Sequence, residues 1–137
     1  MKKFVLAVLA YAVLTLAIAA PWHFMIFKDT YDSLGIYNRA EPIMAIGILT
    51  LFIQGAIMAF LYTRFYRGGT PIVQGVKFGL IMGLFLFSVS TLANAAKIEV
   101  SAISTWIAIQ AAFHLIQFVV TGGAIGLIFG EADAQAQ

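Results

Sequence analysis

Residues 72–96 read IVQGVKFGLIMGLFLFSVSTLANAA, and this run decides the class of the fold. Lys77 is the one charged residue in it. About 20 apolar residues are enough for a helix to cross the hydrocarbon layer of a membrane. A helix is the expected form, because a segment in lipid must satisfy its backbone hydrogen bonds internally. The run therefore predicts a transmembrane helix.

Three further apolar runs have the same character. They cover residues 4–27, 43–63 and 102–129, and polar segments separate them. Of all residues, 62% are hydrophobic and 10% are charged, whereas soluble domains are about 45–50% apolar and about 25% charged. The sequence thus predicts a single transmembrane domain over residues 1–137. We expect an all-α membrane protein with a four-transmembrane-helix antiparallel bundle.

The first run has a second interpretation. Lys2 and Lys3, an apolar stretch and the small residues Ala17 to Ala19 also form the pattern of a cleavable secretory signal. The apolar run continues past this site to Phe27, which favours a helix that is retained.

Basic residues predict the orientation in the membrane, because cytoplasmic loops carry an excess of Lys and Arg. With both termini in the cytoplasm, the inner flanks carry Lys2, Lys3, Arg64, Arg67 and Lys77, and the outer flanks carry Lys28, Arg39 and Lys97. Both termini are therefore predicted to be cytoplasmic, and Trp22 and Trp106 would lie near the outer interface. The compact chain and short loops favour a bacterial inner (plasma) membrane. The tail, residues 131–137, is expected to fray.

Glycines recur at a spacing of four in the third and fourth runs. Small residues on one helix face allow close helix packing in lipid. One interpretation is packing within the bundle, and the other is docking of a second copy or of another membrane subunit. Ser90 and Asn94 continue the first glycine face. The candidate interface residues are Gly75, Gly79, Gly83, Gly122 and Gly126.

Polar residues mark a second helix face in the fourth run. Gln110, His114 and Gln117 share this face with Thr121. Gln54, with Gly47 and Thr50 close in angle, marks a face of the second run. Polar side chains are costly in lipid unless they face the protein interior. We therefore expect these groups to meet with Tyr11 and Thr15 inside the bundle or at an interface. The candidate ligand-binding residues are His114, Gln110, Gln117 and Gln54.

His114 has two interpretations. It could be a neutral histidine that bonds to a glutamine or a backbone carbonyl, or it could contact a ligand such as a quinone, a haem or a lipid. A haem would need His23 as its second axial ligand. At about 1.5 Å per residue, the two histidines differ by roughly 10 Å in depth, which counts against haem. The cofactor therefore stays unknown, with none expected.

No catalytic set can be recognised in the sequence. The chain has no cysteine, which removes thiolate nucleophiles and thiolate metal sites. No Asp or Glu lies inside the four apolar runs, whereas ion-coupled transporters usually place a carboxylate in the membrane. The acidic residues of the outer loop are interpreted as ordinary solvated composition rather than as a cation site. We therefore expect neither enzyme activity nor a metal site.

Two functions remain open at this stage. The glycine faces favour an accessory or structural subunit that acts through helix packing with itself or with a larger membrane complex. The polar face around His114 favours a ligand-binding bundle instead. The expected partners are the lipid bilayer and other membrane subunits. The net charge of +2 is assigned to the cytoplasmic flanks and not to nucleic-acid binding.

Overall fold

The computed structural model describes residues 1–36 and 39–130, and these are helical except for connections. The prediction of an all-helical chain with four long apolar helices is confirmed. The candidate spans are Lys2–Ile26, Met44–Phe65, Pro71–Ala95 and Ile103–Phe129. The elements are α1 (Lys2–Pro21), the π-helical turn η1 (Trp22–Ile26), α2 (Lys28–Leu34), α3 (Met44–Phe65), α4 (Pro71–Phe87), the π-helical turn η2 (Ser88–Leu92), α5 (Ala93–Ala95) and α6 (Ile103–Phe129).

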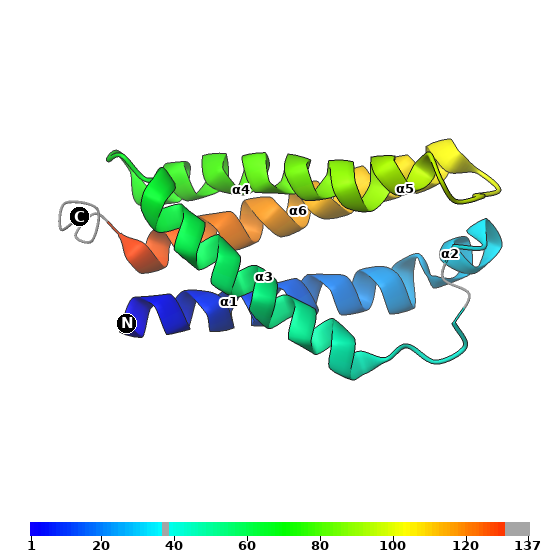
Figure 1. The fold of residues 1–137 in the computed structure, drawn as a ribbon, viewed down its shortest axis with the longest axis horizontal. Coiled ribbons are helices and arrows are strands. Elements are labelled where there is room, and N and C mark those ends of the chain that lie inside the picture. Colours follow the sequence, from blue (N-terminus) through cyan, green and yellow to red (C-terminus); the bar gives the residue numbers. More distant parts are fainter. Residues whose placement is uncertain (37–38, 131–137) are drawn as a thin grey trace.

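Consecutive long helices run in opposite directions, as Figure 1 shows. The N-terminus, the α3–α4 connection and the end of α6 lie together at one end of the bundle, which we call the terminal end. The short helix α2 and the α5–α6 connection lie at the other end, the α2 end. Which end faces the cytoplasm stays a prediction, and the tail 131–137 lies outside the described residues.

Helices α4 and α6 are in closest contact, and their glycines form that contact. A Cβ atom added to Gly122 would lie 2.8 Å from the Cα of Gly79, and one added to Gly126 would lie 2.9 Å from the Cα of Gly75. A Cβ added to Gly83 would meet the side chain of Phe118 at 2.9 Å. The two glycine faces therefore pack on each other within one chain.

The terminal end is closed by aromatic side chains. The Tyr62 ring, 1% exposed, lies 5.4 Å from the Phe78 ring and 5.7 Å from the Phe129 ring, centre to centre. Lys3 also donates a hydrogen bond of 2.8 Å from its Nζ to the backbone oxygen of Phe129. This bond joins the start of α1 to the last turn of α6, where carbonyl groups lack helical partners.

The first half of α3 behaves differently from the rest of the bundle. Every residue from 39 to 50 is exposed, and Figure 1 shows this part of α3 diverging from α4 and α6. Close approach to α1 occurs further along, where a Cβ added to Gly55 would lie 3.3 Å from the Cβ of Tyr11. The bundle is therefore open between α3 and α4 toward the α2 end.

The α2 end has its own small core. Tyr31 and Leu34 of α2 pack with Trp106 of α6, whose side chain is only 3% exposed. The sequence predicted that Trp106 lies near the outer interface, which stays a prediction. The structure adds that the residue is buried beneath α2, which packs on the start of α6.

Candidate functional site

His114 lies near the middle of α6 and uses both ring nitrogens. Nδ1 is 2.7 Å from the backbone oxygen of Gln110, and Nε2 is 3.1 Å from Oγ of Ser90. A carbonyl oxygen can only accept, so Nδ1 carries a proton. A neutral imidazole then accepts at Nε2 from the Ser90 hydroxyl. The Phe118 ring stacks on the imidazole at 6.2 Å, with an angle of 9° between the planes.

A chain of hydrogen bonds joins three helices beside His114. Gln117 of α6 donates from Nε2 to the hydroxyl of Tyr11 at 3.2 Å and to Oγ1 of Thr15 at 3.3 Å. The Tyr11 hydroxyl in turn donates to Oε1 of Gln54 on α3 at 2.9 Å. The polar groups expected from sequence to face the interior therefore do meet there. They join α1, α3 and α6 at one level.

These polar groups surround a cavity of about 230 Å³, which we call the central cavity. It lies where α3 begins to diverge, so its walls come from all four long helices. Three of the four candidate ligand-binding residues line it, namely Gln54, His114 and Gln117. The other lining residues are Thr15, Ala19, Thr50, Leu51, Leu86, Ser90, Phe113 and Phe118.

The fourth candidate residue, Gln110, is placed elsewhere. Its side chain donates a hydrogen bond of 3.2 Å to the hydroxyl of Tyr31, so it faces α2 and does not line the central cavity. Its backbone oxygen still contributes by holding the His114 ring. Gln110 is therefore a positioning group at the α2 end of the site.

Two amide atoms at the central cavity keep hydrogen-bonding capacity. Gln54 uses Oε1 to accept from Tyr11, and Gln117 uses Nε2 to donate. Within the described part of the chain, Nε2 of Gln54 and Oε1 of Gln117 form no further hydrogen bond. The cavity thus offers one free donor and one free acceptor. Its lining, as far as residues 1–36 and 39–130 form it, contains no Asp, Glu, Lys or Arg.

Ser90 is a site residue that the sequence did not connect with His114. The sequence placed it on the glycine face of α4, and the π-helical turn η2 at residues 88–92 carries it to the imidazole. Such turns often occur at functional sites. The run Ser88-Val-Ser-Thr was the available signal, because these hydroxyl groups compete for backbone hydrogen bonds within a helix.

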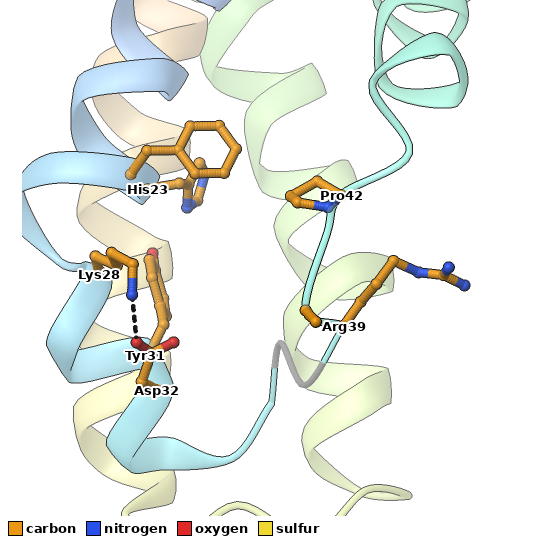
Figure 2. A pocket seen from close by; sticks show the side chains of 8 residues that line it. His23, Lys28, Tyr31, Asp32, Arg39 and Pro42 are labelled. Atoms are coloured by element: carbon orange, nitrogen blue, oxygen red, sulfur yellow. Dashed lines mark hydrogen bonds and ion pairs between the residues drawn. The ribbon is translucent and has the colours of Figure 1, made fainter.

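A second hollow lies at the α2 end, and we call it the α2 pocket. Its volume is about 450 Å³. Figure 2 shows Lys28, Tyr31 and Asp32 on the wall formed by α2, and Arg39 and Pro42 on the facing wall. Lys28 Nζ and Asp32 Oδ2 form an ion pair of 2.7 Å. The hydrogen bond and charge of Asp32 raise the pKa of Lys28, which keeps the amine protonated. The remaining lining residues are His23, Phe24 and Ala40.

Phe113 separates the two histidines. Its ring centre is 4.6 Å from that of His23 and 5.5 Å from that of His114, in edge-to-face contacts. A haem that took both imidazoles as axial ligands would require this ring to leave its place. Within residues 1–36 and 39–130, no group of three or more His, Asp or Glu side chains is arranged to hold a metal ion.

Comparisons with protein-family models, with curated proteins and with solved structures found no match. The functional inference therefore depends on the two hollows and on the residues that line them.

Proposed function

We propose that this protein binds a small, neutral, lipid-soluble molecule in the central cavity. The observation that carries the proposal is the pair of uncommitted amide atoms, Nε2 of Gln54 and Oε1 of Gln117, at a cavity whose lining bears no formal charge. Ligand sites are typically concave and mainly apolar, with a small number of well-placed polar groups. This cavity has that composition.

The chemistry of the lining indicates which ligands fit. A charged headgroup at this depth would be costly without a partner of opposite sign. A carbonyl group on the ligand could accept from Gln54, and a hydroxyl group could donate to Gln117. A quinone, or a lipid with a carbonyl or hydroxyl near its polar end, has this chemistry.

The opening between α3 and α4 supports entry from the bilayer. It lies within the length of the spans, on the side where residues 39–50 are exposed. The terminal end is closed by Tyr62, Phe78 and Phe129. A ligand dissolved in the leaflet at the α2 end would therefore reach the cavity sideways. If the predicted cytoplasmic termini are correct, this is the outer leaflet of the membrane.

A steric variant tests this function without breaking the hydrogen-bond chain. Thr50 lines the cavity, and among the described residues its hydroxyl bonds only to the Ile46 oxygen of its own helix. Thr50→Trp should fill the opening and abolish ligand binding. Ile48→Trp is the matched control, because Ile48 lies on the same exposed stretch and outside the cavity lining.

The measurement is native mass spectrometry of protein extracted gently from its own membrane, followed by solvent extraction of any retained molecule. Wild type and Ile48→Trp should carry a defined neutral mass, and Thr50→Trp should not. Loss of the same mass in Gln54→Leu, but not in Gln74→Leu at the terminal end, would assign the contact to the cavity. Absence of any retained mass in wild type, or equal retention in Thr50→Trp, would refute the proposal.

The exposed half of α3 favours a second candidate function. Residues 43–50 contact no other helix closely enough to bury any of them, so this stretch is available to a second copy or to another membrane protein. The protein would then be an accessory subunit docked through α3 rather than through its glycine faces. The same mass spectrum tests this function, because a protein partner lost in Ile48→Trp would support docking through α3.

A further inference from the structure

The α2 pocket lies where two of the candidate membrane spans end. Its first wall begins where the candidate span Lys2–Ile26 ends, and its second wall precedes the span that begins at Met44. Phe24 lies within the last turn of the span Lys2–Ile26 and Pro42 lies two residues before α3, and both line the pocket with apolar side chains. The pocket is therefore apolar where a glycerol and its chains would lie and charged where a headgroup would lie.

The charges of the pocket have both signs and stand on two walls. Lys28 and Asp32 lie on α2, and Arg39 lies on the connection to α3 (Figure 2). Among the described residues, Arg39 forms no ion pair, and its side chain is exposed. Figure 2 shows the Arg39 guanidinium directed away from Lys28 and Asp32, so the pocket presents one cation and one carboxylate, with a second cation on its facing wall.

The existing ion pair can be exchanged at small cost. The side chains of Lys28 and Asp32 are 59% and 55% exposed, and exposed pairs of this kind contribute little to stability. A ligand that brings an anion to Lys28 and a cation to Asp32 replaces each partner of the pair. A simple anion would satisfy Lys28 but leave Asp32 without its counter-ion.

We propose that the α2 pocket binds the headgroup of a zwitterionic phospholipid from the leaflet at this end of the protein. The phosphate lies between Lys28 and Arg39, which swings inward from the facing wall. The lipid ammonium pairs with Asp32. Phe24 and Pro42 contact the glycerol region. This site is separate from the central cavity and does not depend on what the cavity binds.

The test compares two lipids that differ in headgroup charge. Full-length protein in detergent is titrated with dioctanoyl phosphatidylethanolamine or dioctanoyl phosphatidylglycerol, and the dissociation constants are measured by native mass spectrometry. Wild type should prefer phosphatidylethanolamine by about two- to fivefold, the range expected for one exposed ion pair. Lys28→Gln and Arg39→Gln should each weaken binding of both lipids by about the same factor.

Asp32→Asn is the most specific test, because it removes only the carboxylate that pairs with the lipid ammonium. It should abolish the preference for phosphatidylethanolamine. Lys97→Gln, at the same end of the bundle and outside the pocket lining, is the control for a general loss of positive charge. All these positions are exposed, so the variants should keep the thermal midpoint of wild type.

Three results would overturn the proposal. In the first, Asp32→Asn keeps the wild-type preference between the two lipids. In the second, Lys97→Gln weakens binding as much as Lys28→Gln does. In the third, inorganic phosphate at equal concentration displaces the lipid, which would assign the pocket to a soluble phosphate compound.

Discussion

Two neighbouring glycines of α6 allow a sharp test of the packing between α4 and α6. A Cβ added to Gly122 would lie 2.8 Å from the Cα and 3.0 Å from the backbone nitrogen of Gly79. Backbone atoms cannot move out of the way as a flexible side chain can. A Cβ added to Gly123 would lie 3.5 Å from Cγ2 of Val76, which is an ordinary contact.

The expected magnitudes follow from these distances. Carbon atoms attract best at about 3.5–4.0 Å, so Gly122→Ala must push α4 and α6 apart by roughly 1 Å. Overpacking of this kind costs about 1–3 kcal/mol, and alanine returns up to about 1 kcal/mol through helix propensity. Gly122→Ala should therefore lower the free energy of unfolding by about 1–2 kcal/mol. Gly123→Ala should leave it unchanged or raise it slightly.

The assay is reversible unfolding of each variant in mixed micelles, followed by tryptophan fluorescence. Both substitutions add one methyl group to adjacent positions of the same helix, so effects on the unfolded state should be nearly equal. The contrast between the variants therefore measures the contact between the helices. Equal stability of the two variants would refute the assignment of Gly122 to this contact.

Three further outcomes are expected. Ser33→Cys should react with a membrane-impermeant maleimide in intact cells, whereas Arg67→Cys should react only after permeabilisation, and the reverse pattern would contradict the predicted cytoplasmic termini. Lys3→Met should speed hydrogen exchange in the last turn of α6, because it removes the 2.8 Å bond to the Phe129 oxygen, and unchanged exchange there would show that the bond has no capping role. His114→Phe should lower stability by about 0.5–2 kcal/mol, because it removes two hydrogen bonds inside the membrane, and wild-type stability of this variant would contradict that role.

The sequence was sufficient for the number of long apolar helices, because length and hydropathy alone determine which segments can span a bilayer. It was also sufficient to place Gln54, His114 and Gln117 inside the bundle, since lipid is a poor environment for amide and imidazole groups. The spacing of the glycines in α4 and α6 also predicted that these two helices approach closely, as one of two interpretations.

Other features could not be predicted, because they depend on how whole segments meet. Gln110 shares a helix face with His114, yet its side chain turns to α2, which covers that end of α6. Ser90 bonds to His114 from within the π-helical turn η2, and a local widening of this kind has no clear periodic signal. The divergence of α3 depends on packing partners that are absent along residues 44–50, whose apolar pattern resembles that of any lipid-facing helix.

The hydrogen-bond chain from Gln117 through Tyr11 to Gln54 holds α3 against α1 and α6 at the point where α3 crosses α1. The part of α3 between its first residue, Met44, and Gln54 is about 15 Å long at about 1.5 Å per residue. If this part of α3 rotated by 10° about Gln54 as a rigid helix, Met44 would move by about 2.6 Å. The glycine contact between α4 and α6 would stay intact during such a swing. The protein thus combines the closely packed pair of α4 and α6 with a first part of α3, residues 44–50, that is exposed throughout.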